Sequence, residues 1–176
     1  MRTLATILLL ALCGAVWGQA APRDPSKPTW KSLPTDAEVQ RKYFTDLPLL
    51  DQDGRRVRFY SDVLKDKVVM INFIFTHCRS ACPALAKTFS KVQTELGQRL
   101  GRDVHLISLS VDAERDTPEA LKRWSQQFDA KTGWTLLTGK KENVDWVIHK
   151  LGQWNEDFDQ HSPLILLADV KQGRWQ

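Results

Sequence analysis

Two cysteines stand four positions apart in the stretch FTHCRSACPALAKTF, residues 75–89, and a proline follows the second one. Two thiolates this close can form a disulfide, hold a metal ion, or alternate between the two states. Dithiol oxidoreductases typically place two residues between their cysteines, whereas three separate Cys78 from Cys82. The wider separation suits a soft ion that prefers thiolates, Cu(I) above all, and still permits a disulfide. A structural disulfide is the plainer alternative, although such bridges usually close longer loops.

The residues around the pair predict where the two sulfurs lie. An unbroken apolar run, residues 67–76, is typical of a strand buried on both faces, and a helical pattern begins at Pro83. Because a residue before proline is pushed out of helical dihedrals, we expect Cys82 to be the helix cap and not part of the first turn. The positive end of the helix dipole and the nearby Arg79 favour thiolates, so we expect both sulfurs to ionise easily.

A third ligand would have to come from elsewhere in the chain. Structural zinc requires four protein ligands, and the sequence has no second cysteine pair to complete such a site. His105 falls in a strand pattern and His149 on a helix, where packing or surface roles are expected. His77 adjoins Cys78, but neighbouring side chains diverge on a strand, so we expect it near the site or at the surface. His161, in the irregular loop GQWNEDFDQHSP, would complete a three-ligand copper site; an ordinary loop histidine is the alternative.

The N-terminus predicts export. Residues 1–20 have a positive charge at Arg2, then an apolar run, and end with the small residues Gly18 and Ala20. We therefore expect a signal peptide cleaved after Ala20. A retained anchor in the inner membrane is the alternative, but the apolar run is shorter than the roughly 18 residues that span a bilayer. Cleavage removes Cys13 and leaves one cysteine pair in the exported chain. Residues 21–43 are predicted to form a flexible tether, and residues 44–176 the folded domain.

Charge excludes one class of partner. The chain has 25 basic and 21 acidic residues, for a net charge of +4, and they are scattered along the sequence. Without a basic block or basic residues interleaved with aromatic ones, nucleic-acid binding is not expected.

Hydrophobic patterns supply the elements that must position the thiols. A hairpin around Asp53-Gly54 is predicted first, and strands then alternate with helices, which defines an α/β domain with a central sheet. A cysteine pair between the first core strand and the first helix makes this a thioredoxin-like, three-layer α/β/α fold. The chain ends at KQGRWQ, so we expect the last edge strand and closing helix of that fold to be missing. The predicted core strands are residues 67–76, 104–111, 134–139 and 163–169, and the helices begin at Pro83, at Thr117-Pro118 and before Val144.

The chain resembles the Sco/SenC copper chaperones, thioredoxin-like proteins tied to assembly of the copper A centre of cytochrome c oxidase. The resemblance runs from Phe44 to Trp175. It rests on three fragments in the right order, which are FTHCRSACP (75–83), SLSVDAERDTPEALKRW (108–124) and DQHSPLILLAD (159–169).

Carried over to this chain, the resemblance implies copper, as Cu(I) or Cu(II), bound by Cys78, Cys82 and His161. It also implies delivery to subunit II of cytochrome c oxidase, with other periplasmic copper carriers or thiol reductants as further partners. Three residues depart from the family pattern: Arg79 and Ser80 replace the common Pro and Asp, and Gln160 replaces the Asp before the histidine.

Three functions follow from these residues. The first is a periplasmic copper carrier with a redox-switchable cysteine pair. The second is an enzyme, a thiol-disulfide oxidoreductase that reduces the cysteines of the oxidase copper site and requires the thiols but not His161. The third is a copper or redox sensor. For Asp112, within the second fragment, we expect a strand-end cap or turn role.

Overall fold

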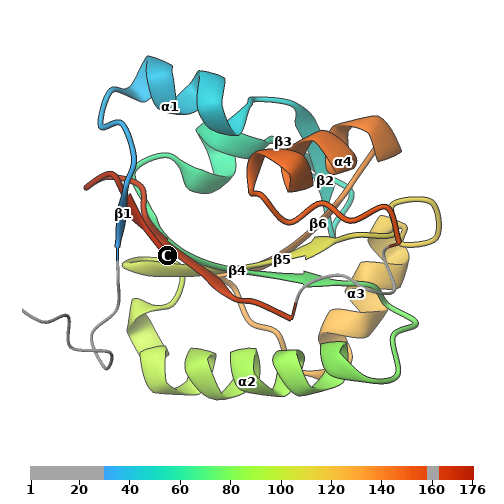
Figure 1. The fold of residues 1–176 in the computed structure, drawn as a ribbon. Coiled ribbons are helices and arrows are strands. Elements are labelled where there is room, and N and C mark those ends of the chain that lie inside the picture. Colours follow the sequence, from blue (N-terminus) through green and yellow to red (C-terminus); the bar gives the residue numbers. More distant parts are fainter. Residues whose placement is uncertain (1–29, 158–162) are drawn as a thin grey trace, which may run out of the picture.

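The computed structural model describes residues 30–157 and 163–176, which form one mixed sheet with helices on both faces (Figure 1). The sheet has eight strands in the order β1-β8-β7-β4-β5-β6-β2-β3. Its strands β4, β5 and β6 run parallel to one another, and β7 adds antiparallel to β4. The strands are β1 (Lys31–Ser32), β2 (Pro48–Asp51), β3 (Arg56–Arg58), β4 (Val68–Ile74), β5 (Val104–Ser110), β6 (Trp134–Thr138), β7 (Leu166–Asp169) and β8 (Arg174–Trp175).

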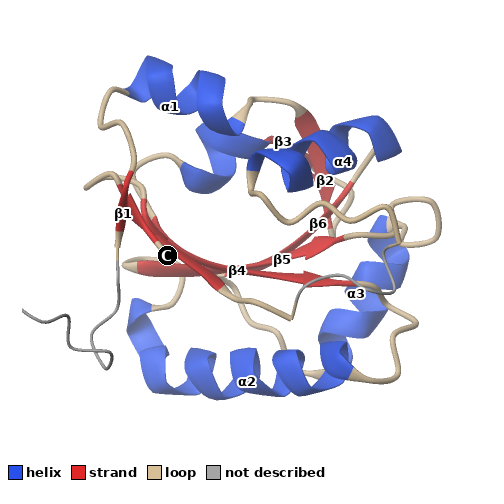
Figure 2. Ribbon diagram, viewed as in Figure 1, coloured by secondary structure: helices blue, strands red, loops and turns tan. Residues whose placement is uncertain are grey.

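The helices form the two outer layers (Figure 2). One apolar core lies between the sheet and the layer that contains α1 (Ala37–Phe44), the short π-helical segment η1 (Phe59–Leu64) and α4 (Lys141–Lys150). A second core lies between the sheet and the layer of α2 (Ala81–Leu96) and α3 (Pro118–Gln127). The predicted three-layer α/β/α architecture is therefore confirmed.

Strand β4 shows why its sequence is apolar at nearly every position. Val69, Ile71 and Phe73 pack into the core beneath α1 and α4. Met70 and Ile74 alternate with them and pack into the core beneath α2. Successive side chains of a strand point to opposite faces, so a strand covered on both faces needs apolar residues at both sets of alternate positions. The run 67–76 predicts such a strand.

The predicted hairpin is also confirmed. Strands β2 and β3 pair antiparallel with Leu49 opposite Val57. Gly54 occupies a left-handed conformation in the turn, with φ +76°. The Asp51 side chain accepts hydrogen bonds from the backbone N–H groups of Asp53 and Arg55, both at 2.9 Å, which fixes the turn.

The predicted cap of α3 is confirmed, and the predicted cap of α2 is wrong. Thr117 caps α3 as predicted, because its hydroxyl accepts a hydrogen bond from the N–H of Ala120. Helix α2 begins at Ala81, so Cys82 lies in the first turn and the prediction that it is the cap is wrong. Pro83 is tolerated there because N–H groups of a first turn have no partner within the helix.

The predicted tether, residues 21–43, is shorter than expected, because β1 (Lys31–Ser32) and most of α1 (Ala37–Phe44) lie within it. Leu33 and Phe44 are buried in the core. The Gln40 side chain is buried too, donating to the Val170 carbonyl at 2.9 Å and accepting from the Tyr60 hydroxyl at 3.0 Å. This segment packs onto the fold through only a few buried side chains. They are too few to produce a periodic pattern in the sequence.

The last edge strand, expected to be missing, is present in short form as β8. It pairs with β7 through Ala168 opposite Trp175, and β1 covers its other side through Lys31 opposite Trp175. A strand of two residues is too short to show an alternating pattern, so β8 has no signal in the sequence. No helix follows β8 within residues 163–176.

The predicted signal peptide, residues 1–20, lies outside the described residues. In the parts of the chain that the structure describes, no helix has the length and apolar character to cross a membrane.

Candidate metal centre

The two thiols lie at the carboxyl end of β4, where the chain turns into α2. β4 ends at Ile74, and the N–H of Cys78 donates to the Phe75 carbonyl at 3.1 Å to close a tight turn. Cys82 follows in the first turn of α2. The sequence thus brings both sulfurs to the positive end of a 16-residue helix, where negative charge is stabilised.

No disulfide joins Cys78 and Cys82, and the two side chains differ in exposure. Cys82 is fully buried against the core beneath α2, whereas Cys78 is partly exposed. The N–H of Cys82 lies 3.5 Å from Cys78 Sγ, and the Ser80 hydroxyl lies 3.8 Å from the same sulfur. Cys78 therefore presents the accessible sulfur of the pair.

The pKa values of the two thiols also differ, and the more exposed thiol, Cys78, is the more acidic one. Burial acts to raise the pKa of Cys78, but hydrogen bonds from Cys82 and Ser80 outweigh it and hold this pKa below the ordinary value. Burial and the contact with Cys78 raise the pKa of Cys82 to about 12. The prediction that both sulfurs ionise easily is therefore right for Cys78 and wrong for Cys82 in the reduced pair.

The structure locates three of the four histidines. His77 Nε2 lies 3.0 Å from Arg115 Nη1, and its ring packs edge-on against Phe75. His105 is half-buried on β5, where burial and then the charge of Lys67 lower its pKa. His149 stacks on Trp154, with the ring centroids 4.5 Å apart.

The expected third ligand, His161, lies outside the described residues. Within residues 30–157 and 163–176, no three His, Cys, Asp or Glu side chains converge in a way that could hold a metal ion. Cys78 and Cys82 are therefore the described part of the candidate site.

A buried carboxylate that the sequence analysis did not single out supports the cysteine turn. Asp116 is fully buried and accepts hydrogen bonds from the Thr76 N–H at 3.1 Å and the Thr76 hydroxyl at 2.6 Å. The Thr76 hydroxyl binds Oδ1, whereas the Ser110 hydroxyl donates to Oδ2 at 2.6 Å, the oxygen that also accepts the Thr76 N–H at 3.1 Å. The available signals were a threonine at the exit of β4 and an aspartate before the Thr117-Pro118 helix start.

Asp112 has the turn role expected of it. Its carbonyl accepts the N–H groups of Arg115 at 3.2 Å and Asp116 at 2.9 Å. Its side chain is 5% exposed, and Oδ2 has no hydrogen-bond donor among the described residues. That oxygen lies 3.5 Å from Nε2 of His77, the residue before Cys78, and 3.7 Å from Arg115 Nε, so the three side chains form a small polar cluster.

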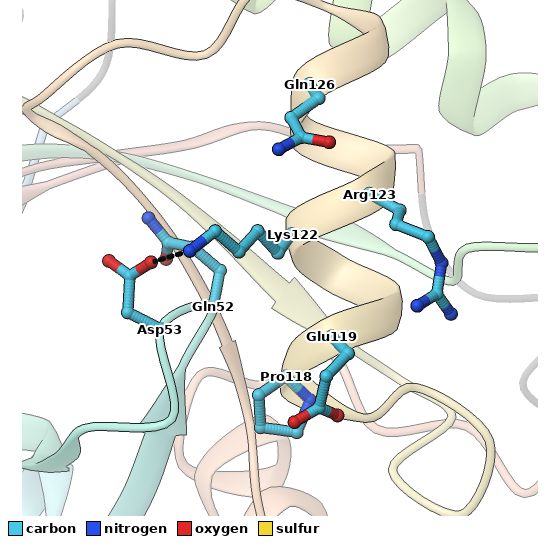
Figure 3. Close-up of a pocket in the computed structure, with 7 residues that line it drawn as sticks. All are labelled: Gln52, Asp53, Pro118, Glu119, Lys122, Arg123 and Gln126. Atoms are coloured by element: carbon cyan, nitrogen blue, oxygen red, sulfur yellow. Dashed lines mark ion pairs between the residues drawn. The ribbon is translucent and has the colours of Figure 1, made fainter.

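A separate surface hollow of about 300 Å³ lies between the β2–β3 turn and α3 (Figure 3). Lys122 reaches across it toward Asp53, with Nζ 3.0 Å from Oδ1, while Arg123 extends from the other side of the helix. None of the seven residues that line it carries a thiol or an imidazole. The hollow is therefore not part of the candidate metal centre.

A parallel β4-β5-β6 core has β7 antiparallel beside β4, with one thiol between β4 and α2 and the other in the first turn of α2. This arrangement defines a thioredoxin-like dithiol protein. Within that class the particular family follows from comparison with known proteins. The sequence pattern of the SCO1/SenC family matches residues 35–165, and the chain belongs to that family.

Among the relatives, the SCO1 protein homolog of Bacillus subtilis is 35% identical over 94 residues, which are 53% of this chain and 47% of that protein. The chain thus aligns with about half the length of this relative. Two solved structures share the fold. ScoI of Bradyrhizobium japonicum with copper bound is 33% identical, with a TM-score of 0.63 over 73% of this chain and 83% of that one. BsSco, a member of the Sco family of cytochrome c oxidase assembly proteins in which a disulfide switch was identified, is 25% identical, with a TM-score of 0.61 over 76% and 80%.

Proposed function

We propose that this chain is an exported copper chaperone that delivers copper to subunit II during assembly of the copper A centre of cytochrome c oxidase. The observation that carries the proposal is the pair of thiols, four residues apart, where β4 turns into α2. Support comes from the family and from the copper-bound ScoI relative of the same fold. Export to the periplasm rests on residues 1–20, with a retained inner-membrane anchor as the alternative.

We propose Cys78, Cys82 and His161 as the ligands. Two thiolates and one imidazole suit Cu(I), and three ligands leave a position through which the ion can pass to an acceptor. Because the Cys82 thiol keeps its proton in the free pair, Cu(I) binding releases that proton. Lower pH should therefore weaken copper binding.

The difference in acidity between the two thiols favours a second candidate, thiol-disulfide oxidoreductase activity. The Cys78 thiolate would attack a target disulfide, forming a mixed disulfide and releasing one target thiolate. Cys82 would then lose its proton and attack Cys78 Sγ, releasing the second target thiolate. The target gains two electrons, and the pair is oxidised to a Cys78–Cys82 disulfide.

Anaerobic Cu(I) titration of the reduced full chain against a competing chelator separates the two functions. The chaperone function predicts one tightly bound Cu(I) per chain. Cys78→Ser and Cys82→Ser should abolish it, and His161→Ala should weaken it while dithiol exchange persists. His149→Ala is the matched control and should bind copper normally, because His149 is stacked on Trp154. A wild-type chain that retains no copper after reduction would contradict the chaperone function and leave the oxidoreductase.

A further inference from the structure

The turn between β5 and α3 holds the segment that leads into Cys78. Val111 N–H donates to the Ile74 carbonyl at 2.8 Å. Both Thr76 donors, the N–H and the hydroxyl, bind Asp116, and His77 lies 3.0 Å from Arg115. The two residues directly before Cys78 are thus both held by one turn of residues 111–116.

Asp116 is the centre of this arrangement. It is fully buried, and its two oxygens accept hydrogen bonds from Thr76 on one segment and Ser110 on another. Hydrogen bonds to a buried carboxylate are stronger than those between neutral groups, and removing the carboxylate would leave these donors without partners. Asp116 therefore fixes the backbone at Thr76 relative to the end of β5.

Cys78 is then held from both sides. Thr76 is fixed two residues before it, and the Cys82 N–H of α2 lies 3.5 Å from its sulfur. A loop held in this way loses little conformational freedom when it binds a ligand, which preserves affinity. Residues that orient metal ligands without touching the metal commonly contribute about 10–100-fold to metal affinity.

We propose that Asp116 is a positioning residue, acting through Thr76 to hold Cys78 where its sulfur and that of Cys82 can bind one Cu(I). The proposal rests on the proposed copper function. It assigns a role to the second sequence fragment, residues 108–124, which holds the cysteine turn in place without binding the metal.

Asp51 provides a matched control. It is 3% exposed and, like Asp116, accepts backbone N–H hydrogen bonds that fix a turn. It belongs to the β2–β3 hairpin, which β5 and β6 separate from β4 in the sheet. Asp51→Ala should thus cost stability without changing the cysteine pair.

The test compares Asp116→Ala, Asp51→Ala and two Thr76 variants of the full chain. The measurements are anaerobic Cu(I) affinity and the reduction potential of the cysteine pair against glutathione. Asp116→Ala should weaken Cu(I) binding by about 10–100-fold and shift the potential, whereas Asp51→Ala should leave both at wild-type values. Thr76→Val, which keeps the N–H but loses the hydroxyl, should show a smaller change in the same direction, and Thr76→Ser should restore wild-type values.

Wild-type affinity and potential in Asp116→Ala and Thr76→Val would overturn the proposal, and so would an equal loss in Asp51→Ala. If Asp116→Ala does not fold, the comparison of Thr76→Val with Thr76→Ser decides by itself. A wild-type chain that binds no Cu(I) would contradict the proposed function. The reduction potential would still test positioning in that case, because its measurement requires no metal.

Discussion

The backbone N–H of Cys82 lies 3.5 Å from the sulfur of Cys78, so the first turn of α2 supports one thiol of the pair with the amide of the other. This relationship makes the pair unequal. Cys78 is the partly exposed sulfur with the lowered pKa, and Cys82 is the buried sulfur that retains its proton. Both the copper chemistry and the redox chemistry proposed above begin from this asymmetry.

Alkylation of the reduced, copper-free chain should therefore be selective. At neutral pH iodoacetamide should modify Cys78 and leave Cys82 unmodified, because the pKa of Cys82 is about 12 and its side chain is buried. Ser80→Ala should slow the modification of Cys78 by raising its pKa, since hydrogen bonds from Ser80 help to lower it. Mass spectrometry after short pulses at several pH values measures both rates.

Thr88→Ala, which removes an exposed hydroxyl bonded to the Ala84 carbonyl within α2, is the control and should leave the Cys78 rate unchanged. Equal modification of both cysteines at neutral pH would contradict the asymmetry.

Gly173 should be required for the turn before β8 to pack against Leu33. It has φ +63°, and a Cβ added there would lie 2.6 Å from the Leu33 carbonyl oxygen. Gly173→Ala should therefore lower the free energy of unfolding by more than the about 1–2 kcal/mol that a left-handed conformation costs a non-glycine residue. Denaturant unfolding measures the loss.

Gly152→Ala separates the two causes, because Gly152 has φ +70° with nothing within 4 Å of an added Cβ. It should lose only the conformational part. Equal losses in the two variants would show that the turn before β8 does not lie against Leu33.

The buried amide of Asn72 should lower the free energy of unfolding. Its side chain is fully buried on β4, and neither of its polar atoms has a hydrogen-bond partner among the described residues. Because an unpaired buried amide costs about 1–3 kcal/mol, Asn72→Leu should raise the free energy of unfolding by a similar amount.

Ser108, opposite Asn72 on β5, offers a comparison of opposite sign. Its hydroxyl accepts the Trp134 indole N–H at 2.9 Å, so Ser108→Ala should lower stability by leaving that donor unpaired. A loss of stability in Asn72→Leu would show that the amide does have a partner in solution.

The sequence predicted the layers well because long apolar runs and strong caps mark them. The buried run of β4, the Asp53-Gly54 turn and the Thr117 cap all carry local signals. The short elements β1 and β8 were missed because two residues show no period. The pairing of β1 with β8 also joins segments from opposite ends of the described chain, which local patterns do not show.

The site was predicted in part. The cysteine spacing identified the thiols, but their unequal acidity depends on the burial of Cys82, which the sequence does not show. The role of Asp116 also depends on folding, because it meets Thr76 across 40 residues of chain. The third ligand, His161, stays a prediction.

Copper X-ray absorption of the Cu(I)-loaded full chain tests the central claim most directly, with wild type and His161→Ala compared. The account predicts two sulfur ligands and one imidazole nitrogen in the wild type, and loss of the nitrogen in His161→Ala. Identical spectra from the two chains, or a coordination shell without two sulfurs, would contradict it.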